Sequence, residues 1–188
     1  MRRLVLFMHV SLDGFVTDAN GSMRFVKVDE EIFDYVGERT SVADMALYGR
    51  VTYEMMDAYW PTAGDEPDAS KHDKEHSAWY NKVDKVVLSK SMKGQQKPNT
   101  IIISDEVEHR IKALKQQGDS EILIFGSPSA AHSLMQYGLI DGFWLFVNPV
   151  LLGGGTPLFN NTQLPAELKL VNSKSFANGV ICLHYEKK

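Results

Sequence analysis

The stretch EILIFGSPSAAHSLMQY, residues 121–137, decides the fold of this chain. Its apolar run, Ile122–Phe125, ends at Gly126, and apolar residues at helical spacing follow. We interpret this pattern as a buried strand, a tight turn and a helix, with Ser127 as the N-cap and Pro128 at the first helical position. The unpaired N–H groups and the positive dipole at the start of such a helix favour binding of a phosphate.

A second stretch suited to phosphate, GRVT, lies at residues 49–52. Gly49 lets a ligand approach the backbone, Arg50 offers a fork of hydrogen-bond donors, and Thr52 adds a hydroxyl at a helix start. The alternative is an ordinary strand–turn–helix junction with a solvated Arg50. Two phosphate-binding stretches in one chain together suggest a dinucleotide ligand.

Length and composition bound the remaining choices. The 188 residues, 44% of them apolar, predict a single globular domain over residues 1–188. A net charge of −4 argues against nucleic-acid partners and against binding to anionic membranes. The one cysteine, Cys182, excludes an internal disulfide framework and fits the reducing cytoplasm. The apolar run Leu4–Val10 is far shorter than the roughly 20 residues of a membrane span, so we expect a first buried strand.

Strand-like and helix-like segments alternate through most of the chain, which predicts an α/β fold with a mixed, mostly parallel sheet. Continuous apolar runs such as Ile101–Ile103 are typical of parallel strands covered on both faces. Phe143–Val150 and Ile181–Tyr185 have no helix between them, and there we expect antiparallel additions to the sheet edge. The expected strands are Leu4–Val10, Met45–Tyr48, Lys85–Leu88, Thr100–Ile103, Ile122–Phe125, Gly142–Val150 and Val180–Tyr185.

Helices are expected between these strands. They cover residues 30–43, 52–59 with an end at Pro61, and 105–117 before Gly118, and a loop with a surface helix occupies 64–81. His72 and His76 share one face of that last helix at a spacing that suits a metal, but Asp73 breaks the zinc-hydrolase pattern. We therefore favour a solvated helix of mixed charge and predict no metal site.

Three further motifs carry candidate chemistry. Asp13 precedes Gly14 and is first a turn signal, yet it also follows a strand whose carboxyl end is where open α/β sheets bind ligands. Ser89 and Lys90 end another strand and suit either an adenosine 2′-phosphate or a solvated loop. The glycines of residues 153–155 favour a simple chain reversal over an anion-binding loop.

Taken in order, five motifs resemble the dihydrofolate reductase-like family, and in particular the reductase domain of the bifunctional riboflavin-biosynthesis enzyme, the RibD C-terminal domain. They are SLDGF at 11–15, LYGRVTYE at 47–54, VVLSKS at 86–91, EILIFGSPS at 121–129 and NPVLLGGGTPLF at 148–159. The resemblance implies a mixed sheet with flanking helices, NADPH across the carboxyl ends of the strands, and a homodimer.

The resemblance also implies roles for individual residues. Asp13 matches an aspartate that these reductases hold at the substrate. The cofactor-binding residues it implies are Gly49, Arg50 and Thr52 for the phosphates, Ser89 and Lys90 for the 2′-phosphate, and Gly126, Ser127, Ser129 and Ala130 for the pyrophosphate turn.

Two departures separate this chain from the riboflavin-pathway enzymes it resembles. Phe125 stands where those reductases usually have a glutamate, and Ser127 replaces a second glycine. An apolar ring accepts no hydrogen bond from a ribose or pyrimidine. We therefore expect an NADPH-dependent reductase acting on a small heteroaromatic or carbonyl substrate. The alternatives are 5-amino-6-(5-phosphoribosylamino)uracil reductase and a nucleotide-binding protein without reductase activity.

The proton donor and the pocket walls have more than one candidate. Asp13 would act as an acid near neutral pH only with a raised pKa, and the alternative sources are Asp29, Glu30, Asp34 and water. Phe15, Tyr53 and Trp60 are expected either to line the substrate pocket or to be core aromatics.

Overall fold

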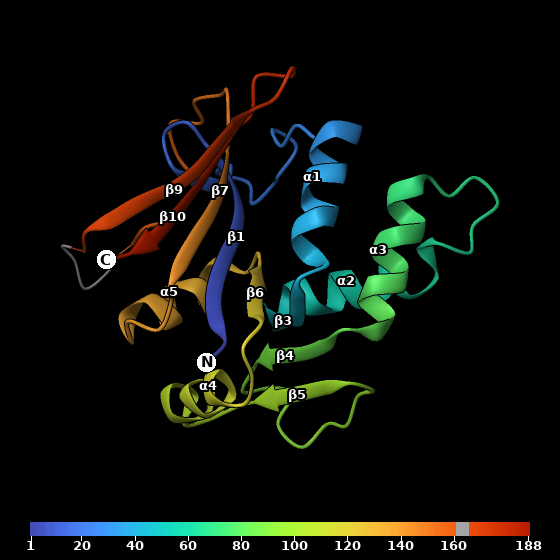
Figure 1. Ribbon diagram of the computed structural model, residues 1–188, viewed down its shortest axis with the longest axis vertical. Coiled ribbons are helices and arrows are strands. Elements are labelled where there is room, and N and C mark those ends of the chain that lie inside the picture. The colour runs from blue at the N-terminus through green and yellow to red at the C-terminus, as the bar shows by residue number, and fades with distance from the viewer. Residues whose placement is uncertain (161–165) are drawn as a thin grey trace.

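The computed structural model describes residues 1–160 and 166–188. Its centre is an eight-stranded sheet in the order β5-β4-β3-β6-β1-β7-β10-β9, which runs from β5 at one end to β9 at the other (Figure 1). A small second sheet pairs β2 with β8. The strands are β1 (Arg3–Ser11), β2 (Phe15–Thr17), β3 (Ala43–Gly49), β4 (Asp84–Leu88), β5 (Thr100–Ile103), β6 (Glu121–Phe125), β7 (Gly142–Asn148), β8 (Thr156–Pro157), β9 (Leu168–Ser175) and β10 (Ile181–Lys187).

The strands from β5 to β7 in this order are all parallel to their neighbours. We expected the segment Phe143–Val150 to be an antiparallel addition, and this was wrong: β7 runs parallel to β1, with Val5 opposite Gly142 and Ser11 opposite Asn148. The reason is the helix α5 (Pro128–Gln136), which crosses from β6 to β7 and returns the chain in the same direction. The expected antiparallel addition begins at β10, which pairs with β7 and β9.

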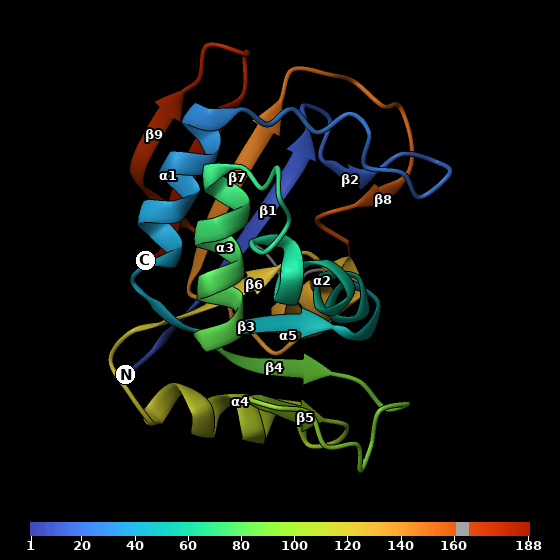
Figure 2. The same cartoon turned by 90° about the vertical axis from the view of Figure 1, so that its right-hand side faces the viewer.

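Helices cover both faces of the sheet, which is why its inner strands are apolar throughout. On β1, Leu4 and Leu6 pack toward α4 (Val107–Gln116) and α5, whereas Val5 and Phe7 pack toward α1 (Glu30–Thr40), α2 (Arg50–Ala63) and α3 (Lys71–Lys82). Figure 2 shows α1 and α3 lying in front of β1 and β7.

The helices differ from the sequence expectations in their bounds and in their burial: α1 ends at Thr40 rather than at residue 43, and α4 spans Val107–Gln116 rather than 105–117. The helix α2 spans Arg50–Ala63 and continues through Pro61, so the expected helix of 52–59 with an end at the proline was wrong. The helix α3 begins with a capping box between Ser70 and Asp73. We expected its surface to be solvated, but one face of the helix is buried. His76 and Tyr80 are buried against the sheet, so the interpretation of His76 as part of a solvated face was wrong.

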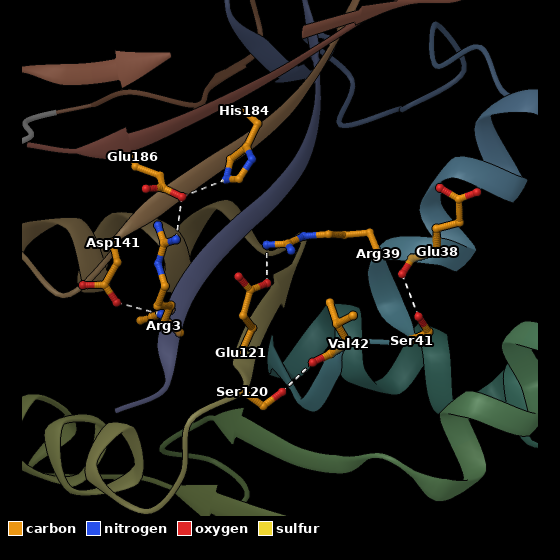
Figure 3. A network of polar contacts seen from close by, with 11 residues as sticks. Arg3, Glu38, Arg39, Ser41, Val42, Ser120, Glu121, Asp141, His184 and Glu186 are labelled. Carbon is orange, nitrogen blue, oxygen red and sulfur yellow. Dashed lines mark hydrogen bonds and ion pairs between the residues drawn. The ribbon is translucent and has the colours of Figure 1, made fainter. Parts of the chain in front are cut away.

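A polar network holds the end of α1 against the amino ends of the strands (Figure 3). Arg39 forms an ion pair with Glu121 at the start of β6, and its guanidinium lies 5.1 Å from the centre of the Trp144 ring. Arg3 contacts Glu186 at 2.5 Å, on the neighbouring part of the sheet. Breaking a partly buried charge pair of this kind leaves one charge without a partner, so the network fixes the position of α1. The candidate site lies at the other end of the strands, where the parallel strands have their carboxyl ends.

Candidate cofactor and substrate site

The turn after β6 has the form that the sequence predicted. Ser127 occupies the N-cap position of α5, although its side chain makes no capping hydrogen bond, and Pro128 occupies the first helical position. Gly126 and Ser127 both have left-handed backbone conformations, with φ of 64° and 57°. This is normal for glycine and uncommon for serine, and such residues concentrate at ligand-binding sites.

The two predicted phosphate-binding stretches meet in space. A Cβ atom added to Gly49, at the end of β3, would lie 1.9 Å from Oγ of Ser127. A Cβ atom added to Gly126 would lie 3.3 Å from Cγ2 of Thr52, in the first turn of α2. The turn after β3 and the turn after β6 therefore interlock, and each glycine makes room for a side chain of the other turn.

A groove of about 360 Å³ runs along this edge of the sheet. Its walls come from the ends of β3, β4 and β5 and from the starts of α2, α4 and α5. It brings together most of the residues that we assigned to a cofactor. They are Gly49, Arg50, Ser89, Lys90, Ser127, Ser129 and Ala130.

A second pocket of about 410 Å³ adjoins the groove. The remaining two predicted cofactor residues, Thr52 and Gly126, line this pocket instead. Groove and pocket share Val51, Ser127 and Ser129, so the two cavities lie next to each other. The pocket is largely apolar; besides the shared residues its lining includes Phe7, Met8, Val16, Met23, Met55, Met56 and Phe125.

The pocket contains a histidine that sequence reasoning missed. The ring of His9, on β1, stacks on Phe146 with the ring centres 4.8 Å apart. Burial lowers its pKa to about 4, and its Nδ1 atom is enclosed without a hydrogen-bond partner among the described residues. The available signal was a single polar residue inside the apolar run Leu4–Val10, on the same face as Phe7.

Asp13 lies outside both cavities and holds a turn. Its carboxylate accepts hydrogen bonds from the backbone N–H of Gly153 at 2.7 Å and of Leu152 at 3.1 Å, and from the Ser11 hydroxyl at 2.6 Å. These bonds lower the pKa of Asp13 to about 2, first through the Ser11 bond and then through Gly153. A general acid needs the opposite shift, so this conformation does not support Asp13 as the proton donor. The glycine-rich stretch 153–155 is a bend before β8, and its Gly153 N–H binds the Asp13 carboxylate.

The two predicted substrate-binding aromatics do not line either cavity. Phe15 lies in β2, opposite Pro157 of β8. Tyr53 is buried beneath α2, with its ring centre 6.4 Å from that of Tyr48, so its alternative interpretation as a core aromatic fits the structure. Trp60 packs behind the pocket and donates a hydrogen bond to Sδ of Met56 at 3.0 Å.

The alternative carboxyl donors are also outside the cavities. Asp29 caps α1 and accepts a hydrogen bond from Asn178 at 2.7 Å, and Asp34 pairs with Lys71. Glu30 is exposed in the first turn of α1. None of the three is among the described residues that line the groove or the pocket.

Within the described residues, no three His, Cys, Asp or Glu side chains come together in a way that would hold a metal ion. In the same part of the chain, every helix is too short or too polar to cross a lipid bilayer.

The fold and the site geometry define an α/β protein of the dihydrofolate reductase-like class, with its cavities at the carboxyl edge of a mostly parallel sheet. The family described as RibD C-terminal domain matches residues 2–182, and this chain belongs to that family. Family membership and the shared fold support a reductase.

Three similar proteins illustrate this relationship. Uncharacterized protein YyaP of Bacillus subtilis is 30% identical over 98% of this chain and 94% of its own length. A pyrimidine reductase-like protein from Corynebacterium diphtheriae superimposes with a TM-score of 0.69 at 16% identity, over 100% of this chain and 92% of that one. A dihydrofolate reductase from Enterococcus faecalis, complexed with NADP(H), gives a TM-score of 0.63 at 13% identity, over 99% and 96% of the two chains.

Proposed function

We propose that this protein is an NADPH-dependent reductase that transfers a hydride to a small heteroaromatic or carbonyl substrate. The observation that carries the proposal is that the polar groove and the apolar pocket adjoin each other at Val51, Ser127 and Ser129. A long ligand that binds its phosphates in the polar groove can extend one end into the apolar pocket, beside a substrate.

The residues of the groove fit such a cofactor. Ser127 and Ser129, at the positive start of α5, and the guanidinium of Arg50 would hold the pyrophosphate. Ser89 and Lys90 would hold a 2′-phosphate. Gly49 and Gly126 leave room for the two turns to close on each other. When bound, NADPH supplies the hydride.

The protein contributes position and an apolar environment to the reaction. The pocket would shield the faces of the nicotinamide and the substrate from bulk water, and its walls would hold the two next to each other. Because no described carboxyl group lines the pocket, the proton that completes the reduction would come from water.

The rival function, nucleotide binding without reduction, draws support from that same lack of a carboxyl acid. Titration of the purified protein with NADPH and with NADH, followed by nicotinamide fluorescence, tests the cofactor. Tight binding that prefers NADPH supports the proposal, and absence of binding to either overturns it. Oxidation of bound NADPH by added pterins, pyrimidines or quinones then separates an enzyme from a binding protein.

We further propose a cytoplasmic homodimer that forms through the outer strand β9. This strand is an edge of the sheet, and most of its residues are exposed. Leu170 and Val171 expose 48% and 47% of their surface, which is unfavourable for apolar residues on a free sheet edge.

A further inference from the structure

We propose that the apolar pocket selects an uncharged carbonyl compound, whose oxygen accepts a hydrogen bond from the ring of His9. This inference rests on the proposed function and names the substrate class of the same site. It disfavours phosphorylated and carboxylated substrates.

The lining of the pocket provides the first argument. None of its described residues carries a charge near neutral pH, and His9 is its one titratable group apart from hydroxyls. Placing a phosphate or a carboxylate among these side chains would remove the anion from water without a partner, which is strongly unfavourable. The cationic residues of the site, Arg50 and Lys90, line the groove instead.

The shape of the walls provides the second argument. Four methionines line the pocket, at positions 8, 23, 55 and 56. Methionine side chains are flexible and polarizable, and they adapt to flat apolar molecules and contact aromatic rings favourably. Phe125 adds a further apolar surface, which accepts no hydrogen bond from a ligand.

The position of His9 provides the third argument. Stacking on Phe146 fixes the ring, and its Nδ1 atom is enclosed with no partner among the described residues. A neutral imidazole has one donor and one acceptor, and a buried acceptor without a partner costs less than a buried donor without one. We therefore assign the hydrogen to Nε2, which leaves His9, a residue of the pocket lining, one N–H donor for a ligand. A carbonyl oxygen is its natural acceptor.

Isatin and isatin-5-sulfonate test this inference, because they share one flat dicarbonyl ring system and differ in one sulfonate group, which carries a single negative charge. Their affinities are measured by calorimetry, with the wild-type protein and without NADPH. We expect isatin to bind at least tenfold more tightly than its sulfonate. Equal affinities, tighter binding of the sulfonate, or no binding of isatin up to its solubility limit would overturn the inference.

Variants at His9 test the hydrogen bond. His9→Phe keeps the stacking on Phe146 and should weaken isatin binding by about 3- to 10-fold, the effect of one uncharged hydrogen bond. His9→Gln, which restores a donor, should recover part of the loss. His109→Phe, on the exposed surface of α4, is the matched control and should change nothing. Unchanged isatin affinity in His9→Phe would refute the role of His9.

The affinity for NADPH, measured on the same variants, separates this inference from the proposed function. Retained NADPH binding without discrimination between the two isatins would refute the substrate class alone. If the wild-type protein does not bind NADPH, the proposed reductase function is refuted, whatever the isatin result.

Discussion

Oγ of Ser127 occupies the space that a side chain at Gly49 would need: a Cβ atom built on Gly49 would lie only 1.9 Å from this oxygen. The two residues lie far apart in sequence, yet each limits what the other can be. The turn after β3 and the turn after β6 therefore act as one unit.

Gly49→Ala should destabilise the protein by about 1–3 kcal/mol, because the new methyl group overlaps Ser127. In a Ser127→Gly background the same change should cost much less, since the next atom, Cβ of Ala130, lies at an ordinary 3.6 Å. Urea unfolding of the four proteins measures this coupling. Gly37→Ala is the control, because nothing lies within 4 Å of its Cβ position. Additive effects of the two changes would contradict the interlocking of the turns.

Lys90→Gln should weaken NADPH binding by about 10- to 150-fold and leave NADH binding unchanged, because one charge-assisted hydrogen bond to the 2′-phosphate is worth about 1.5–3 kcal/mol. Lys93→Gln provides a control in the same loop, because Lys93 pairs with Asp105 outside the groove. Fluorescence titration gives both affinities. An equal loss in the two variants would mean that the lysines act only through general charge.

Asp13→Asn should lower the thermal stability near neutral pH and leave the affinity for NADPH intact. The carboxylate holds the Leu152–Gly153 backbone, and its pKa is lowered, so its contribution is present above the unfolded value and is lost as the pH falls toward 2. Thermal unfolding and cofactor titration at pH 7 measure the two effects. If the variant were as stable as the wild type but inactive, Asp13 would have to be reinstated as a catalytic residue.

Acid should destabilise the folded protein between pH 6.5 and 4. Burial lowers the pKa of His9 to about 4 and that of His76 to about 3, so both stay neutral in the folded state while the unfolded chain takes up protons. Each then reduces the free energy of unfolding by on the order of 1 kcal/mol per pH unit. Urea unfolding at several pH values gives the slope. His76→Leu should flatten it, and an unchanged slope would show that His76 titrates alike in both states.

Val171→Lys should convert the homodimer into a folded monomer, because Val171 is exposed on the edge strand β9 and the substitution adds a charge to the proposed interface. Sedimentation velocity measures the assembly and circular dichroism the fold. Lys112→Ala, on the exposed side of α4, should leave the assembly unchanged. A wild-type protein that sediments as a monomer at all concentrations would rule the interface out.

Local features such as turns could be predicted from the sequence. Features that depend on the direction of a side chain could be predicted less well. The turn at Gly126 and Ser127 was predictable because an apolar run, a cap and a proline specify it within a few residues. Tyr53 was harder to assign, because the residue at which α2 begins decides which face of the helix carries Tyr53. In the structure its ring lies toward Tyr48 and not in the pocket. The strand β9 was missed because its largely exposed residues show no apolar pattern.

His9 illustrates a different limit. A histidine within a strand reads as part of the core, and the sequence does not show that the carboxyl half of β1 passes beneath a pocket formed by α2 and the turn after β6. Asp13 shows the reverse case. Its motif matched the family, but only the contact with Gly153 reveals that its carboxylate holds a turn.

The contact between Trp60 and Met56 gives the molecule an internal optical reporter. Met56 faces the pocket, and its sulfur accepts a hydrogen bond from the indole on the other side. A ligand that restrains this methionine therefore alters the surroundings of the Trp60 indole. Trp79 and Trp144 are not among the lining residues, and they pack behind Phe125 and Phe7, which are. Intrinsic fluorescence can thus report occupancy of the substrate end of the site without a label and without turnover.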